Sequence, residues 1–160
     1  MPVFVLIGSF AVALIFSLMS FMTVAAVLPE MKDAWSLSNT EAGVVGGAFF
    51  VGYIAAVLLL TSLTDRIDAK RIYIFSALIG GTASILLGCT ADGFWSGIVF
   101  RILTGLGLAG TYMPGLRALT DLLPEKKRNR GVVYYTSFFA LGSGLSILVG
   151  GEIKEWLDWR

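Results

Sequence analysis

The first 29 residues of the chain, MPVFVLIGSFAVALIFSLMSFMTVAAVLP (1–29), form an unbroken run without Asp, Glu, Lys or Arg. A bilayer core about 30 Å thick is crossed by roughly 20 apolar residues in a helix, so this run is long enough to span a membrane once. A cleaved secretory signal would instead place a basic region before a shorter apolar core. We therefore interpret the run as a first transmembrane helix.

The rest of the chain shares this apolar character. Of the 160 residues, 56% are hydrophobic and 14% are charged, and the mean hydropathy is +0.82. These values exceed what a soluble domain with a polar surface shows. Further apolar stretches follow the first, and the predicted spans are about 3–28, 39–63, 72–91, 94–119 and 131–151. The sequence thus predicts an all-α membrane protein with about five transmembrane helices in a single domain, residues 1–160.

Two polar signals predict where the first helix ends and the second begins. Pro29 is expected to stop the first helix, because proline lacks the N–H that the helix ladder needs. The polar residues 30–33 would then form a short loop. Ser38 and Glu41, three residues apart, fit a capping box at the start of the second helix.

Basic residues gather in alternate loops of this topology. Between the second and third spans they are Arg66, Lys70 and Arg71, and between the fourth and fifth they are Lys126, Lys127, Arg128 and Arg130. The remaining loops contain only Lys32. The positive-inside rule therefore predicts a cytoplasmic amino terminus, and we expect the plasma (inner) membrane. A net charge of +1 gives no argument for a nucleic-acid partner.

Two similar segments hint at an internal repeat. Residues 28–32 (LPEMK) resemble residues 123–127 (LPEKK), and each follows an apolar span. Under the predicted orientation they lie on opposite membrane faces, which an inverted repeat of three helices would produce. Because Pro-Glu is a common helix stop, coincidence is the alternative.

Rows of small residues four apart occur in several spans. Such rows let helix backbones approach closely in lipid. Packing of the bundle is the ordinary interpretation, and a mobile seam between helices is the alternative. The rows are Gly43 and Gly47, Gly52 and Ala56, Gly80, Ser84 and Gly88, Gly105 and Ala109, and Ala140 and Gly144.

Arg101 is the charged residue that lies deep within a predicted span, roughly 10 Å from the start of the fourth helix. Facing lipid it would cost several kcal/mol, so it should face the bundle interior or a water-filled cavity. Two roles remain open at this point. Arg101 either meets an anion or an unseen partner, or it donates structural hydrogen bonds to carbonyls and small polar groups nearby.

Catalytic and metal-binding constellations do not occur within the predicted spans. The chain has one cysteine, Cys89, and no histidine, so an intrachain disulfide and the usual transition-metal ligand sets are excluded. The spans also contain no nucleophile with a base and no paired carboxylates. We expect neither an enzyme nor a bound cofactor or metal.

Residues 61–71, TSLTDRIDAKR, resemble the loop motif GxLxDRxGRK/R between helices two and three of the major facilitator superfamily (MFS). Thr61 and Asp68 replace the two glycines, and Ala69 replaces a closing basic residue. The resemblance implies that Asp65, Arg66 and Lys70 latch the two halves of a carrier on the cytoplasmic side. An ordinary charged loop that fixes topology is the alternative. The matching residues are Leu63, Asp65, Arg66 and Lys70.

A second motif is similar to the same family over residues 101–109, RILTGLGLA, which fit its helix-four pattern RxxxGxGxA. The matching residues are Arg101, Gly105, Gly107 and Ala109. The fifth span lacks the Gly-Pro pair of the motif found in antiporters of this family, so drug-proton exchange is not favoured. The resemblance covers essentially the whole chain, and it implies an MFS-like bundle that is an incomplete six-helix half.

Candidate residues for a substrate cavity follow from the helical period. The hydroxyl residues of the first helix step three apart down one side, and those of the fourth helix lie near one face with Arg101. Both helices line the cavity in the resembled family. Hydroxyls in membrane helices often bond their own backbone, which is the structural alternative. The candidates are Ser17, Ser20, Thr23, Arg101, Thr104 and Tyr112, with Thr111 as an alternative to Tyr112.

The resemblance implies a secondary transporter that moves a small-molecule solute by alternating access, of which this chain is an amino-terminal fragment. Its expected partners are the lipid bilayer, the solute, and the missing carboxy-terminal half or a partner chain. Half of a drug and metabolite exporter built from five-helix repeats is one alternative. A nontransporting membrane subunit or remnant is another. The spans offer no deep carboxylate, so an acid for proton coupling would lie in the missing portion.

Overall fold

The computed structural model describes residues 3–63 and 66–156, and the regular structure within these ranges is helical. The helices are α1 (Val3–Ala34), α2 (Asn39–Leu63), α3 (Ala69–Thr90), α4 (Phe94–Leu122) and α5 (Glu125–Trp156). Each contains a window long and apolar enough to cross a membrane. The prediction of an all-α, multi-pass membrane protein is therefore confirmed.

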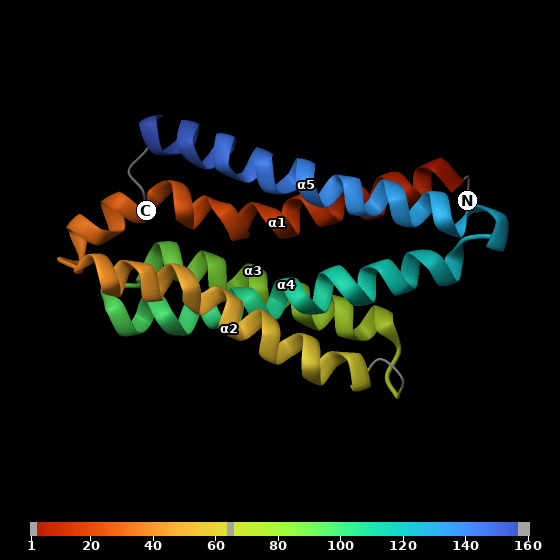
Figure 1. Ribbon diagram of the computed structural model, residues 1–160, viewed down its shortest axis with the longest axis horizontal. Coiled ribbons are helices and arrows are strands. Elements are labelled where there is room, and N and C mark those ends of the chain that lie inside the picture. The colour runs from red at the N-terminus through yellow and green to blue at the C-terminus, as the bar shows by residue number, and fades with distance from the viewer. Residues whose placement is uncertain (1–2, 64–65, 157–160) are drawn as a thin grey trace.

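The helices form two layers (Figure 1). In one layer α5 lies along α1, and in the other α4 packs against both α2 and α3. Direct contacts between α4 and α5 are sparse by comparison. The two layers meet mainly where α1 approaches α4, so these two helices form the centre of the bundle.

The interface between α2 and α4 is a contact between backbones. A Cβ atom on Gly52 of α2 would overlap the carbonyl of Ile102, and a Cβ atom on Gly105 of α4 would overlap the carbonyl of Phe49. Glycine at both positions therefore lets the two helices approach more closely than any side chain would allow. The same device joins α4 to α3, where a Cβ atom on Gly80 would lie 3.1 Å from the Cα of Gly107.

The interface between α1 and α5 uses a different row of small residues from the one predicted. Gly142, Ser146 and Gly150, four apart, face α1, and the hydroxyl of Ser146 donates to the carbonyl of Met19 at 2.7 Å. A Cβ atom on Gly150 would lie 3.0 Å from the Cγ2 of Thr23. A hydrogen bond between helices in lipid adds to such packing.

Two of the predicted small-residue rows do not pack against helices. Ala140 and Gly144 of α5 are exposed, and so are Gly43 and Gly47 of α2. Spacing alone does not show which of several rows of small residues on one helix faces a neighbouring helix. Two positions along a helix turn a side chain by about 200°, so the α5 row is displaced onto the opposite face.

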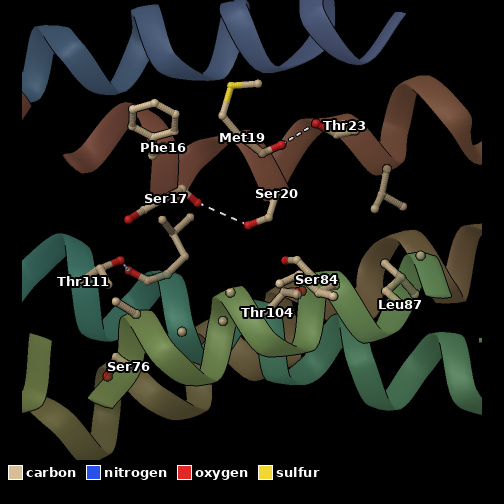
Figure 2. A pocket seen from close by; sticks show the side chains of 18 of the residues that line it. Phe16, Ser17, Met19, Ser20, Thr23, Ser76, Ser84, Leu87, Thr104 and Thr111 are labelled. Carbon is tan, nitrogen blue, oxygen red and sulfur yellow. Dashed lines mark hydrogen bonds between the residues drawn. The ribbon is translucent and has the colours of Figure 1, made fainter. Parts of the chain in front are cut away.

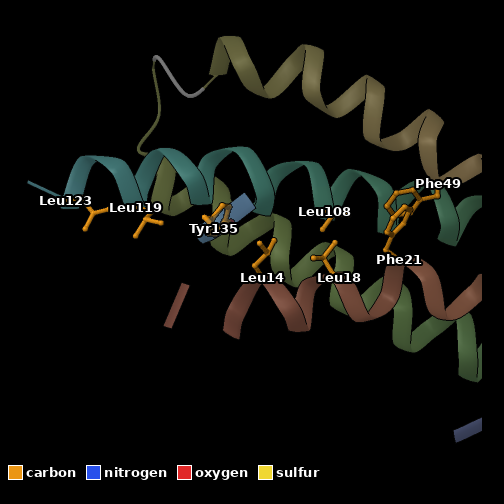
Figure 3. Packing of buried hydrophobic residues seen from close by; sticks show 8 residues of the cluster. All are labelled: Leu14, Leu18, Phe21, Phe49, Leu108, Leu119, Leu123 and Tyr135. Atoms are coloured by element: carbon orange, nitrogen blue, oxygen red, sulfur yellow. The ribbon is translucent and has the colours of Figure 1, made fainter. Parts of the chain in front are cut away.

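A hydrophobic cluster fills the space between the two layers (Figure 3). Leu14, Leu18 and Phe21 of α1 pack with Leu108 and Leu119 of α4 and with further members from α2, α5 and the end of α4. The buried Tyr135 of α5 also reaches across this space. Its hydroxyl donates to the carbonyls of Thr111 and Tyr112, at 3.5 and 3.4 Å.

The prediction that Pro29 ends the first helix is wrong. Pro29 lies inside α1, which continues through the polar residues 30–33 to Ala34. Proline's backbone φ is compatible with a helix, and a membrane helix tolerates the missing hydrogen bond when neighbouring groups support it. At this end of α1 the ammonium of Lys154 forms an ion pair with Glu30 at 2.6 Å.

The basic residues 126–130 were also expected in a loop, but they form the first turns of α5, which begins at Glu125. Helices α1, α4 and α5 all extend beyond the predicted spans, because a helix can continue into the headgroup region after its apolar part ends. The membrane boundaries along them stay a prediction. The capping box is confirmed, since Ser38 N donates to Glu41 Oε2 at 2.8 Å and Glu41 N to Ser38 Oγ at 3.2 Å.

Helix α4 also contains a proline. Pro114 is buried in its cytoplasm-proximal half under the predicted orientation, and α4 continues past it to Leu122. Because proline has no N–H, the carbonyl of Gly110, four residues earlier, receives no hydrogen bond from this position. Thr111, Pro114 and Gly115 are buried whereas Met113 is exposed, so neighbouring helices support α4 on one face at this point.

Candidate functional site

The guanidinium of Arg101 lies between three helices. Its side chain projects from α4 and is only 4% exposed. Nη1 donates to the carbonyls of Ser20 and Phe21 on α1, at 3.4 and 3.5 Å, and Nη2 donates to the carbonyl of Gly46 on α2, at 3.4 Å. One planar group therefore connects α1, α2 and α4 at the centre of the bundle.

An aromatic ring packs against one side of this arginine. The guanidinium carbon lies 4.8 Å from the ring centroid of Phe49, within the range of a cation–π interaction. Phe49 in turn stacks on Tyr53, with centroids 6.3 Å apart. Among the residues that the structure describes, Arg101 Nε is buried and has no hydrogen-bond partner. The carbonyl bonds near 3.5 Å are also long, so this charge is only weakly satisfied.

Tyr112 lies further along α4 among other aromatic residues. Its ring stacks on Tyr135, with centroids 5.8 Å apart, and meets the edge of Phe139 at 5.0 Å. Tyr53 and Tyr112 are both partly buried and pack against the hydrophobic cluster of Figure 3. Arg101 and Tyr112 thus belong to the region where α1, α2, α4 and α5 converge.

A separate groove of about 720 Å³ opens between α1, α3 and α4 (Figure 2). Four of the candidate residues line it: Ser17, Ser20 and Thr23 from α1, and Thr104 from α4. Arg101 and Tyr112 are not among its lining residues. The structure therefore divides the six candidates between two regions of the bundle, which the helical period did not distinguish.

The candidate hydroxyls in the groove are mostly bonded to their own helices. Ser17 donates to the carbonyl of Ala13 at 3.0 Å, Ser20 to that of Ser17 at 3.2 Å, and Thr104 to that of Arg101 at 2.8 Å. Thr23 donates to the carbonyl of Met19 in the same way. Their donors are already used, so the groove wall behaves as a surface of small, largely apolar groups.

The predicted gating loop is described in part. Asp65 lies outside the described residues, and Arg66 and Lys70 are exposed. The carboxylate of Asp68 accepts a hydrogen bond from the backbone N–H of Lys70 at 2.8 Å and caps α3. Asp68 replaces a motif glycine, and sequence reasoning missed its capping role, although an Asp before an apolar helix is the usual signal for it.

The same loop lies near the end of α4. A shallow groove of about 390 Å³ is lined by residues 67–70 and by Arg117 and Asp121 of α4, among others. Arg117 and Asp121 are four residues apart and so share one face of the helix. Their charge and spacing were available in the sequence, but their position beside the loop depends on how α3 and α4 pack.

The helix-four motif residues hold α4 against its neighbours. Gly105 gives the close approach to α2, Gly107 the close approach to α3, and Ala109 is buried. A Cβ atom on Gly107 would lie 2.7 Å from the backbone N of Gly80. Together with Arg101, this short segment joins α4 to α1, α2 and α3.

These features define a polytopic helical membrane protein whose centre holds a buried arginine. Residues 10–160 match the family model of the Major Facilitator Superfamily, and the chain belongs to this family. The family consists of transporters of small solutes and not of enzymes, and its members are embedded in a lipid bilayer.

Several curated proteins are similar to almost the whole chain. The putative transporter SVOPL of Mus musculus is 29% identical over 157 residues, which are 98% of this chain and 31% of that protein. The gentisate transporter of Corynebacterium glutamicum is 30% identical over 161 residues, which cover 98% of this chain and 35% of that protein. The niacin transporter NiaP of Acinetobacter baylyi is 24% identical over 137 residues, which cover 86% of this chain and 31% of that protein. The chain thus spans about a third of the length of the relatives it matches.

Proposed function

We propose that the whole protein is a secondary transporter that moves a small organic solute across the plasma membrane by alternating access. This chain supplies the first five helices. The observation that carries the proposal is the match of residues 10–160 to a transporter family. The buried Arg101, joined by long hydrogen bonds to two neighbouring helices, supports it, because ionisable groups inside a membrane usually mark a transport pathway.

We further propose that the solute carries a carboxylate and meets Arg101. Two relatives are named for gentisate and niacin, which are aromatic carboxylic acids. An arginine fork binds a carboxylate through short, charge-assisted hydrogen bonds, which are stronger than its long bonds to carbonyls. The partly buried ring of Tyr53, which stacks on the buried Phe49 beside Arg101, offers a surface for an aromatic solute.

Membership of the Major Facilitator Superfamily argues against the five-helix-repeat exporter. In our proposal the remaining cavity wall comes from the rest of the whole protein, and the loop residues Asp65, Arg66 and Lys70 latch the halves together. The alternative that remains is a membrane subunit that does not itself transport a solute.

The proposal is tested by solute counterflow in proteoliposomes that contain the purified whole protein. We expect labelled gentisate or nicotinate to accumulate transiently when the same solute is preloaded inside, because alternating access exchanges solute across the bilayer. Protein-free liposomes are the control. Neutral and cationic organic solutes should compete poorly if a carboxylate is recognised. Absence of counterflow across a panel of organic acids, neutral solutes and cations would indicate a nontransporting subunit.

The orientation is tested with single cysteines in the whole protein, after Cys89 and all other cysteines have been replaced. Asp92→Cys places a thiol in the turn between α3 and α4, and Lys127→Cys places one in the first turn of α5. With a cytoplasmic amino terminus, a membrane-impermeant maleimide should label Asp92→Cys on intact cells. Lys127→Cys should react only after permeabilisation. The opposite pattern would reverse the orientation, and the cysteine-free protein controls for background.

A further inference from the structure

Helix α1 contains a proline near its end, and one side chain of α5 contacts α1 on both sides of it. Proline has no N–H and its ring crowds the carbonyl four residues earlier, so Pro29 interrupts the hydrogen-bond ladder of α1. The ammonium of Lys154 donates to the carbonyl of Ala26 at 3.4 Å and forms an ion pair with the carboxylate of Glu30 at 2.6 Å. Ala26 precedes the proline and Glu30 follows it. One cation therefore connects the two sides of the interruption.

The end of α1 beyond the proline is held from two directions. Helix α5 lies along α1 up to this end (Figure 1), and Lys154 is its contact with Glu30 there. From the other direction Met31 is only 1% exposed and belongs to a buried cluster with Val45 of α2 and Leu87 of α3. An apolar contact thus fixes the end of α1 to one layer of the bundle, and a polar contact fixes it to the other.

The polar contact is of a kind that can open. The side chains of Lys154 and Glu30 are 30% and 35% exposed, so water and dissolved ions compete for both charges. The carboxylate of Glu30 is also only half satisfied, because its Oε2 is buried and has no hydrogen-bond partner among the described residues. Such a contact adds little net stability, although it fixes one geometry.

We propose that Lys154 is a releasable clamp that holds the end of α1 in its helical position across Pro29. While the clamp is closed, the ammonium substitutes for the support that the interrupted ladder lacks. When it opens, the end of α1 bends at the proline, which is the usual position of a bend in a long helix. Under the predicted orientation this clamp lies at the outer face of the membrane.

A lysine suits this role better than a simple charge does. An ammonium has three donors, so Lys154 serves the Ala26 carbonyl and the Glu30 carboxylate at the same time. A carboxylate at position 154 has no proton to donate to a carbonyl. Exchanging the two charged residues therefore restores the ion pair but not the contact that precedes the proline.

Hydrogen–deuterium exchange of the whole protein tests the proposal, with mass spectrometry of peptides that cover residues 30–34. Lys154→Met keeps a long side chain and removes both contacts. We expect these amides to exchange about two- to fivefold faster, the range set by losing a partly exposed ion pair. Pro29→Ala restores the missing backbone donor. In that background, relative to Pro29→Ala alone, Lys154→Met should change the exchange little.

Two milder changes and a control sharpen the test. Glu30→Gln leaves Lys154 bonded to the Ala26 carbonyl, so its exchange should be intermediate. Glu30→Lys combined with Lys154→Glu should stay faster than the unmodified protein. Glu152→Gln is the matched control, because Glu152 is an exposed acid two residues from Lys154 on α5, and its exchange should not change.

Three results would overturn the clamp. The first is unchanged exchange in Lys154→Met. The second is equal acceleration with and without Pro29, which would indicate a general loss of packing between α1 and α5. The third is full recovery in the charge-exchanged protein, which would reduce the contact to a simple ion pair. Exchange is measured without solute, so the clamp and the proposed transport fail independently.

Discussion

Replacing Arg101 with alanine in the whole protein is expected to reduce solute uptake by about tenfold or more while membrane insertion is retained. The guanidinium donates to carbonyls of Ser20 and Phe21 on α1 and of Gly46 on α2, so its loss removes a connection between three helices. In the proposed function Arg101 also binds the carboxylate of the solute. A hydrogen bond to a charged group is worth about 1.5–3 kcal/mol, and each 1.4 kcal/mol is a factor of ten, so uptake should fall by about tenfold or more. Initial uptake rates in proteoliposomes, corrected for reconstituted protein, measure this.

Two further variants separate charge from geometry at this position. Arg101→Lys keeps the charge but not the planar fork that reaches α1 and α2 together. Recovery of uptake with lysine would indicate a point-charge role, and continued loss would indicate that the fork is needed. Arg130→Ala is the matched control, because Arg130 is exposed on α5. Normal uptake by Arg101→Ala would reject the role of Arg101 in transport.

Replacing Gly105 with alanine is expected to destabilise the bundle strongly. The added Cβ would overlap the carbonyl of Phe49 and lie 3.0 Å from the backbone N of Tyr53. Both atoms belong to the backbone of α2, so relief requires the two helices to move apart. Overpacking of this kind costs about 1–3 kcal/mol. The midpoint temperature of the monodisperse fraction, measured by fluorescence-detected size exclusion in detergent, should fall clearly below that of the unmodified protein.

Gly47→Ala tests whether the loss is specific to the interface. Gly47 is an exposed glycine of α2 with open space around its Cβ position. Alanine is favoured over glycine inside a helix by about 0.5–1 kcal/mol, so this change should leave the midpoint unchanged or raise it slightly. Equal midpoints for Gly105→Ala and Gly47→Ala would contradict the close α2–α4 contact. A lower midpoint for Gly47→Ala would point to an unseen contact on that face.

The sequence predicted the number and order of the helices well but placed several of their ends too early. Hydropathy reports which residues suit lipid, whereas a helix ends where its backbone hydrogen bonds end. Pro29 was expected to stop α1, yet the helix continues to Ala34. By contrast, Ser38 and Glu41 marked the start of α2 correctly, because a capping box directly satisfies backbone donors.

The candidate site was only partly predictable for a similar reason. The cost of a charge in lipid indicated that Arg101 turns inward, and it is buried. Its partners at Ser20, Phe21 and Gly46 are backbone carbonyls, which any residue type supplies, so no sequence pattern identifies them. The helical period likewise predicted a common face for Ser17 and Ser20 but not the groove that this face lines. The groove depends on how α1 packs beside α3 and α4.

The proline in α4 lies next to the hydrogen bonds by which Tyr135 of α5 contacts this helix. Pro114 leaves the carbonyl of Gly110 without its helical donor, so the hydrogen-bond ladder of α4 is weakest at this point. Prolines are a common cause of bends in long helices. The hydroxyl of Tyr135, carried by α5 in the other layer, binds the carbonyls of Thr111 and Tyr112 beside that point. A side chain from α5 thus stabilises the backbone of α4 next to the proline. We therefore expect the curvature of α4 to follow the position of α5, so that a shift between the layers would bend the helix that holds Arg101.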